Sequence, residues 1–423
     1  MSRPTAVVLV TGSELVRGGR TDENGPFLAR ELSTRGIEPE RVLVVGDRPD
    51  GLEAAFRESL GARLVVTSGG LGPTHDDRTV ETLARVAGRE LVLDPALEQE
   101  IGGVVRGLSE RFRRPYEEFE SGVRKQATIP EGAESLGLAG TAPGLVLEVD
   151  GSVVVVLPGP PGELQRLWAR ALETAAVQRV LEAASRPEHM VLRFFGLPES
   201  AVARVVERAG GEGEGVDITI CAHDLEVQVD LVVQPGAEAH ADVLQRALAE
   251  ELPQALFADD ERPVEELVLD LARQQRLSIA AAESCTGGLV AARLTSVPGS
   301  SEVFAGGVVA YDNRLKRDLI AVPEDILSRH GAVSAETAAA MAQGVRRAVG
   351  ADVGVSVTGV AGPGGGTPEK PVGLVHLHAS TPAAEEAMEL HLPGDRAAVR
   401  RRAAASALHL LRRVLAQSRH TQA

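Results

Sequence analysis

Cysteine and aromatic residues are scarce in this chain of 423 residues. It contains two cysteines, one tryptophan and two tyrosines, and aromatic side chains make up 3% of its residues. Two cysteines cannot build a disulfide framework or a cysteine-rich zinc site, and they fit a reducing compartment. The first residues lead straight into a short strand without the apolar segment of a signal peptide. We therefore expect a cytoplasmic protein.

Long apolar runs and an excess of positive charge are also missing. No apolar run approaches the length of a membrane span, and Val153 to Leu157 has the length of a strand. The formal net charge of −16 at pH 7 disfavours nucleic acid or an anionic membrane as the main partner. What remains is an ordinary globular composition, with 43% hydrophobic and 25% charged residues, over a length that indicates two or three domains.

The first third of the chain alternates between strand and helix patterns. Apolar runs predict strands at residues 6–10, 41–45 and 63–67, and the segments between them predict helices at 24–35 and 51–60. Strands and helices joined by such short links are typical of a doubly wound α/β sheet. In these sheets the ligand binds beyond the carboxyl ends of the strands.

Polar loops follow these strands and are expected to meet at that edge. They contain Ser13 with Glu14, Asp47, and a glycine-rich segment ending in Asp76 and Asp77. Glycine N–H groups can approach an anion closely, and adjacent carboxylates can hold a divalent cation that bridges to a phosphate. The alternative is a tight turn whose aspartates charge a helix N-terminus. The convergence of the loops favours a binding site.

Residues 186–260 change pattern and predict a small α+β module of strand, helix, two strands and helix. This order resembles a KH-type arrangement. An RNA-binding version needs a cationic glycine loop, whereas the glycine loop at residues 210–215 is acidic. We interpret the segment as a spacer or dimerisation module.

The last third is organised around residues 282–288, where Ser284, Cys285 and Thr286 stand in a row between a strand pattern and a helix pattern. A strand, a tight turn and a helix present a hydroxyl or thiol at the strand end, and the helix N-terminus supplies N–H donors. An N-capping residue with a glycine turn is the alternative. From these residues alone the nucleophile stays open between Ser284 and Cys285.

Further polar residues follow the later strands of this third, so we expect them at the same edge. They are Tyr311 and Lys316, Thr358 with the glycine loop after it, and Arg396 at the start of the last helix. Together they suggest nucleophilic amide hydrolysis, with Lys316 as base if burial lowers its pKa. Backbone N–H groups around Thr286 and Gly287 would stabilise an oxyanion, and Arg396 would hold a phosphate. A solvated Lys316 and a purely structural Tyr311 are the alternatives.

Longer motifs in both halves resemble those of one known family. They are residues 11–15, 22–24, 68–77, 124–126, 140–144, 282–288, 359–363 and 394–396. In content and order these motifs resemble the competence/damage-inducible protein family, CinA, over nearly the whole chain. The resemblance implies an α/β fold with a molybdopterin-binding-like domain at residues 1–172, a KH-type module with linker at 173–260, and a nicotinamide mononucleotide deamidase (PncC) domain at 261–423.

The resemblance implies a homodimeric enzyme of pyridine-nucleotide recycling. Its C-terminal domain would convert nicotinamide mononucleotide to nicotinate mononucleotide and ammonia without a cofactor. Its N-terminal domain would split ADP-ribose into AMP and ribose 5-phosphate with a divalent cation such as Mg²⁺, and K⁺ is a further candidate. A non-catalytic nucleotide sensor and a molybdopterin-type ligand binder are the alternatives.

The family pattern also implies roles for single residues. It places the nucleophile at Ser284 and the base at Lys316, with supporting catalytic roles for Tyr311 and Thr358. The implied substrate-binding residues are Cys285, Thr286, Gly287, Gly288, Gly359, Ala361, Gly362 and Arg396 in the C-terminal domain, and Ser13, Asp22, Asn24, Asp47, Gly69, Gly70, Gly72, Thr74 and Lys125 in the N-terminal domain. The implied metal ligands are Glu14, Asp76 and Asp77. Many family members carry aspartate at the position of Ser13, whose hydroxyl brings no charge to a cation.

Overall fold

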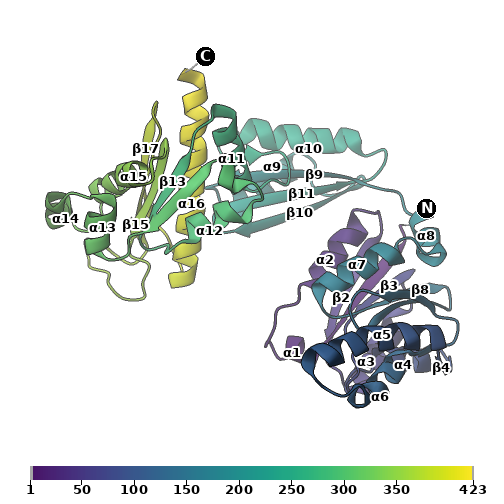
Figure 1. Ribbon diagram of the computed structural model, residues 1–423. Helices are drawn as coiled ribbons and strands as arrows, with labels where there is room; N and C mark the ends of the chain where they lie inside the picture. Colours follow the sequence, from purple (N-terminus) through teal and green to yellow (C-terminus); the bar gives the residue numbers. More distant parts are fainter. Residues whose placement is uncertain (1–2, 422–423) are drawn as a thin grey trace. The chain divides into compact units, whose positions relative to one another are not determined.

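The computed structural model describes residues 3–421. They form two compact units that divide between Glu188 and His189 (Figure 1). Among the residues described, no helix combines the length and the apolar composition that crossing a membrane requires.

The first unit is built on a six-stranded sheet of order β2-β1-β3-β8-β7-β6. Strands β2, β1, β3 and β8 are parallel, whereas β7 and β6 are antiparallel to their neighbours. The sheet is therefore mixed, with the expected parallel strand-helix repeats at one side. The elements are β1 (Thr5–Thr11), α1 (Ser13–Val16), α2 (Asn24–Ser33), β2 (Glu38–Val45), α3 (Pro49–Ser59), β3 (Leu64–Ser68), α4 (Thr79–Val86), β4 (Leu91–Leu93), α5 (Pro95–Phe112), α6 (Glu120–Gln126), β5 (Thr128–Pro130), β6 (Glu134–Leu138), β7 (Pro143–Val149), β8 (Ser152–Leu157), α7 (Pro161–Ala171) and α8 (Ala175–Glu182).

The strands β1, β3 and β8 are buried on both faces, as continuous apolar runs predict, whereas the edge strand β2 is largely exposed. Val8 packs in a core with residues of α2, α7 and α8, and Leu9 packs in a second core with residues of α3, α4 and α5. Successive strand residues point to opposite faces, so one apolar run serves both cores. Helix α8 adds Val177 and Val180 to the first core, so this compact unit runs past the expected boundary at residue 172.

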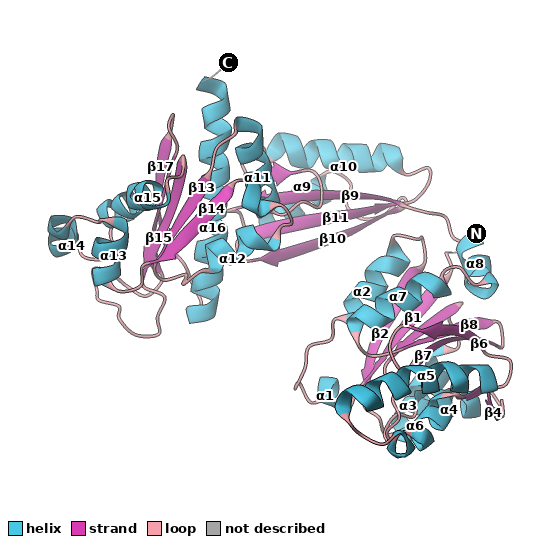
Figure 2. Ribbon diagram, viewed as in Figure 1, coloured by secondary structure: helices cyan, strands magenta, loops and turns pink. Residues whose placement is uncertain are grey.

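The second unit begins with a four-stranded sheet of order β10-β11-β9-β12 (Figure 2). Alternate residues of β11, such as Val229 and Leu231, pack against apolar residues of α9 and α10. This alternation is typical of a sheet with one buried face. The expected α+β module is present, and its KH-type identity stays a prediction. The elements are β9 (Glu188–Phe195), α9 (Glu199–Arg208), β10 (Val216–His223), β11 (Glu226–Val233), α10 (Glu238–Glu251) and β12 (Leu256–Ala258).

The rest of the second unit is a five-stranded sheet of order β14-β13-β15-β16-β17, with helices on both faces (Figure 1). Strands β14, β13 and β15 are parallel, and β16 and β17 continue the sheet antiparallel. Helices α13, α14 and α15 cover one face, and α11, α12 and α16 cover the other. The elements are α11 (Val264–Gln275), β13 (Ile279–Glu283), α12 (Leu289–Ser296), β14 (Phe304–Val309), α13 (Asn313–Ile320), α14 (Glu324–His330), α15 (Ala335–Val349), β15 (Val353–Gly359), β16 (Leu374–Ser380), β17 (Glu385–His391) and α16 (Arg396–Thr421).

The three parallel strands end side by side at Glu283, Val309 and Gly359. Strand β14 ends at Val309, so Ala310 and Tyr311 belong to the loop before α13. The loops after these strands therefore share one edge of the sheet, which is where the reactive side chains were expected.

Candidate active site

Ser284 and Lys316 meet at the carboxyl edge of the C-terminal sheet. Ser284 follows β13 directly, and its backbone N–H donates to the Val357 carbonyl at 2.9 Å, which fixes its position against β15. Lys316 lies on α13 and is 1% exposed. Its Nζ lies 3.1 Å from Ser284 Oγ, 2.8 Å from the Ala310 carbonyl and 3.2 Å from the Tyr311 carbonyl.

The surroundings of Lys316 suit a neutral amine. Burial lowers the pKa of its amino group, and Asp312 acts in the opposite direction. A neutral amine has two N–H donors and one lone pair, and the site offers two carbonyl acceptors and one hydroxyl. Both N–H groups can therefore donate to carbonyls while the lone pair accepts the Ser284 hydroxyl. This is the arrangement that a serine nucleophile and its base require.

Cys285 points away from this pair into the core. It is 4% exposed and packs with the apolar residues between the sheet and α16. Burial raises the pKa of its thiol to about 12. A thiol is nucleophilic as the thiolate, which this environment suppresses. Of the two candidate nucleophiles, the structure favours Ser284.

Glu283 occupies the N-terminus of α12, a role that the sequence did not suggest. Its buried carboxylate accepts the N–H groups of Gly288 and Ala291 at 2.9 Å and of Val290 at 3.1 Å. These helix donors are therefore not free for a ligand, which corrects the expectation above. An acidic residue at the end of a buried strand, just before a glycine turn, was the signal that could have revealed this role.

The remaining donors lie in the turn itself. The Gly287 N–H donates to the Ser284 carbonyl at 3.2 Å, so it does not contribute to an oxyanion site as expected. Within residues 3–421, the N–H groups of Cys285 and Thr286 donate to no protein oxygen. Arg400, which the sequence analysis also missed, donates to the Thr286 carbonyl at 2.7 Å and steadies the turn. Two adjacent N–H groups beside the nucleophile are suited to stabilise an oxyanion.

Tyr311 and Arg396 form a clamp beside this turn. Arg396 donates to the Tyr311 hydroxyl at 2.8 Å and to the Gly362 carbonyl at 2.7 Å. Tyr311 is 57% exposed, and its phenol faces Arg396, not Ser284. Arg396 opens α16, where Asp395 caps the helix by accepting the Ala398 N–H. An exposed arginine held in this way can bind a phosphate at a helix N-terminus.

Thr358 and the loop after it have structural contacts. The Thr358 hydroxyl donates to the Ala332 carbonyl at 2.6 Å, and among the described residues it makes no hydrogen bond to Ser284 or Lys316. At Gly359, an added Cβ would lie 2.6 Å from the Leu374 carbonyl, so glycine allows close strand packing. Ala361 is buried in the core. The structure thus gives Thr358 a positioning contact and no direct contact with the nucleophile.

A cleft of about 320 Å³ lies at the carboxyl edge of the N-terminal sheet. It brings together four of the expected residues, Glu14, Asp47, Asp76 and Asp77, with the glycines at 69, 70 and 72. An added Cβ at Gly69 would lie 2.6 Å from the Thr11 carbonyl, and at Gly72 2.4 Å from the Asp77 carboxylate. These glycines therefore let the loops approach one another closely.

Several expected binding residues of this domain are engaged with the protein. Ser13 donates to Asp47 through its N–H at 2.9 Å and its hydroxyl at 2.7 Å. Asp22 accepts the N–H groups of Asn24 and Gly25 at the start of α2. The Asn24 amide donates to the Gly159 carbonyl at 2.7 Å. Asp22 and Asn24 line a neighbouring cavity of about 760 Å³, and these contacts leave fewer free groups than expected.

Lys125 does not reach the cleft as a free cation. Its Nζ donates to the carbonyls of Thr74 and Asp77, the latter at 2.7 Å, and the side chain lines a neighbouring cavity of about 230 Å³. The Thr74 hydroxyl contacts the carboxylates of Asp76 and Asp77, both at 2.5 Å. The Thr74 hydrogen bond also lowers the pKa of Asp76. Lys125 thus holds the acidic loop in place.

The donors in this cleft fit a divalent cation that needs substrate oxygens to complete its shell. Within residues 3–421, no three His, Cys, Asp or Glu side chains are close enough to hold an ion alone. Mg²⁺ is commonly bound by one or two carboxylates, water and substrate phosphates. Glu14, Asp76 and Asp77 line one cleft and supply hard oxygen ligands of this kind.

Comparison with known proteins places these sites in a family. Models of a probable molybdopterin binding domain and of the CinA C-terminal domain match residues 7–177 and 261–415. A CinA-like protein of Mycolicibacterium vanbaalenii is 44% identical over 420 residues, which are 97% of this chain and 98% of that protein. The chain belongs to the CinA family. A CinA-like protein of Mycobacterium tuberculosis is 42% identical over 97% of both chains. Among solved structures, the competence/damage inducible protein CihA from Agrobacterium tumefaciens is 39% identical and covers 37% of this chain and 99% of its own, with a TM-score of 0.35.

Each CinA domain contains one of the two sites. The Ser284–Lys316 pair lies within the matched CinA C-terminal domain, and the acidic cleft lies within the matched molybdopterin binding domain. The family and the α/β fold class expected from the sequence are confirmed.

Proposed function

We propose that the C-terminal domain hydrolyses the carboxamide of nicotinamide mononucleotide to nicotinate mononucleotide and ammonia. The observation that carries this proposal is the 3.1 Å contact between Lys316 Nζ and Ser284 Oγ, made by an amine that is 1% exposed. The CinA family membership and the nearby Arg396 clamp support a substrate that carries both an amide and a phosphate.

In the first half of the reaction, Lys316 accepts the Ser284 proton as Oγ attacks the amide carbon. The N–H groups of Cys285 and Thr286 stabilise the oxygen that becomes negative. When the C–N bond breaks, the lysine ammonium returns the proton to the leaving nitrogen, which departs as ammonia. An ester on Ser284 remains.

In the second half, Lys316 accepts a proton from water as the water oxygen attacks the ester carbon. The C–O bond to Ser284 then breaks, and the same proton returns to Oγ. The products are the carboxylic acid and free Ser284, so no group outside the chain is consumed except water. Replacing Ser284 is the direct test, and its outcome is argued in the Discussion.

Arg396→Gln should raise the KM for nicotinamide mononucleotide about 10- to 100-fold, with a smaller change in kcat, because a charge-assisted contact to the phosphate is lost. Steady-state ammonia release measures both constants. Arg401→Gln is a matched control on the same helix, since Arg401 pairs with Asp224 at 3.0 Å away from the clamp. An unchanged KM in Arg396→Gln would show that the phosphate of the substrate binds elsewhere.

We also propose that the N-terminal cleft hydrolyses the diphosphate of ADP-ribose to AMP and ribose 5-phosphate. A divalent cation bound jointly by the substrate phosphates and by carboxylates from the set Glu14, Asp76 and Asp77 would neutralise the diphosphate, which these carboxylates alone would repel. The cleft of about 320 Å³ and its carboxylate lining support this second activity.

Asp77→Asn should abolish most AMP formation, by about 10²-fold or more, because an amide binds a divalent cation more weakly than a carboxylate. Ammonia release from the C-terminal domain should stay within twofold of wild type, which provides an internal control for folding. Chromatographic assay of AMP over a Mg²⁺ titration is the measurement. Equal AMP formation by the variant at low Mg²⁺ would contradict the assignment.

A further inference from the structure

A cavity in the C-terminal half lies apart from both sites described above. It measures about 750 Å³ and lies where the α+β module meets β17 and α16. Its apolar wall includes Leu197, Met388 and Leu390, and Phe195 supplies an aromatic face. A volume of this size accommodates a drug-sized molecule.

The ionisable residues that line the cavity are all basic. They are His391, His409, Arg412 and Arg413, and no carboxylate of the described residues lines it. This composition is unusual for a chain with a net charge of −16. Burial lowers the pKa of His409 to about 4, so the permanent positive charge of the lining comes from Arg412 and Arg413.

Arg412 differs from the other basic residues of the cavity in its polar contacts. Within residues 3–421 its guanidinium makes no ion pair, and its Nε is buried without a hydrogen-bond acceptor. The guanidinium lies over the Phe257 ring, whose centroid is 5.7 Å from the guanidinium carbon. The neighbouring Arg413, by contrast, pairs with Glu386 at 2.6 Å. Burial and Arg413 both lower the pKa of Arg412, which is the direction expected of a cation without a counterion.

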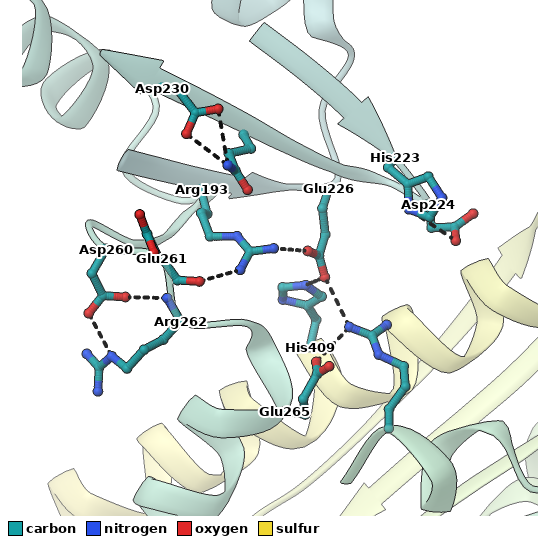
Figure 3. A network of polar contacts seen from close by, with 12 residues as sticks. Arg193, His223, Asp224, Glu226, Asp230, Asp260, Glu261, Arg262, Glu265 and His409 are labelled. Atoms are coloured by element: carbon teal, nitrogen blue, oxygen red, sulfur yellow. Dashed lines mark hydrogen bonds and ion pairs between the residues drawn. The ribbon is translucent and has the colours of Figure 1, made fainter. Parts of the chain in front are cut away.

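Ring stacking and hydrogen bonds fix the cavity wall beside Arg412. His409 on α16 stacks on Phe195, with ring centroids 3.8 Å apart, and its Nε2 lies 3.0 Å from Glu226 (Figure 3). Glu226 also accepts from Arg193 at 3.1 Å, so the α+β module and α16 share one polar network. Among the described residues, His409 Nδ1 and the Nε atoms of Arg412 and Arg413 are buried without a hydrogen-bond partner. Orphaned buried nitrogens indicate a missing polar partner such as water or a ligand.

We propose that this cavity binds a small organic anion, with a phosphate or carboxylate group on Arg412 and an apolar or aromatic body against Phe195, Met388 and Leu390. This proposal rests on the cavity alone and does not depend on either proposed activity. Because the lining comes from the α+β module and from α16, a bound anion stabilises the junction between them.

The test is isothermal titration of the full-length protein with 1-naphthyl phosphate in the presence of EDTA. We expect saturable binding, which Arg412→Gln weakens about tenfold or more because a charge-assisted contact is lost. Arg401→Gln, on the same helix but outside the cavity, should bind within twofold of wild type. Inorganic phosphate and 1-naphthol should each bind more weakly than 1-naphthyl phosphate. Inorganic phosphate lacks the aromatic ring, and 1-naphthol lacks the anionic group.

Two further variants make the outcome decisive. His391→Glu changes an exposed rim residue, so folding is preserved, and the new carboxylate should weaken binding about threefold or more. Arg396→Gln should leave the affinity unchanged, because it removes the phosphate contact of the Ser284 site only. Absence of binding to wild type, or binding that is sensitive to Arg396→Gln and insensitive to Arg412→Gln, would overturn the proposal.

Discussion

Ser284→Ala should release ammonia from nicotinamide mononucleotide about 10⁵-fold more slowly than the wild-type protein, because removal of a serine nucleophile leaves only binding and oxyanion stabilisation. The change removes one oxygen from a residue that is 8% exposed, so the fold has little reason to change. A coupled ammonia assay gives kcat, and equilibrium binding of nicotinamide mononucleotide to the variant should be retained.

Cys285→Ala is the matched control for this prediction. The two residues are neighbours, but Cys285 packs in the core and its thiol has a pKa of about 12. Its replacement should leave kcat within about threefold of wild type and lower stability by about 1 kcal/mol through lost packing. Full activity in Ser284→Ala together with loss of activity in Cys285→Ala would show that the Cys285 thiol is the nucleophile.

The edge where Ser284 and Lys316 meet could be predicted from the sequence because its causes are local. The apolar run before Ser284 and the glycines after it specify a strand and a turn. Parallel strands then bring their following loops to one edge, whatever the distance between them along the chain. The same reasoning succeeded for the acidic loops of the first domain, which do line one cleft.

Side-chain partners across long separations could not be predicted in this way. Arg396 meets Tyr311 across 85 positions, and His409 meets Glu226 across 183 positions. Neither pair follows from spacing, because each depends on how a helix packs on a distant element. The sequence also did not reveal that a protein side chain occupies the N–H donors expected for a ligand. Glu283 takes the α12 N–H groups that a ligand was expected to use.

The proposed chemistry depends on the burial of Lys316, which charge patterns in the sequence could not show. Lys316 lies in a helix with exposed basic and acidic neighbours, so a solvated side chain was the simpler interpretation. Only the packing of α13 against the sheet encloses the amine and lowers its pKa. The lowered pKa of this lysine is therefore a property of the tertiary structure.

Lys316→Gln should lower kcat for ammonia release about 10³-fold, because general bases contribute about 10²- to 10⁴-fold and the amide has no basic lone pair. Glutamine keeps N–H donors for the carbonyls of Ala310 and Tyr311, so this change disturbs the buried site less than an apolar replacement would. Circular dichroism should match wild type, and KM should change little. A variant with wild-type kcat would show that Ser284 loses its proton to another group.

The pH dependence separates a base from a merely structural lysine. A base works in its neutral form, so the wild-type kcat/KM should rise as pH increases through the pKa of Lys316 and then level off. Since burial lowers that pKa, the inflection should lie below the ordinary lysine value of about 10.4. In Lys316→Gln this inflection should vanish, and the residual rate should increase with hydroxide concentration. If the inflection survives in the variant, it belongs to a different group and Lys316 serves only to hold the loop.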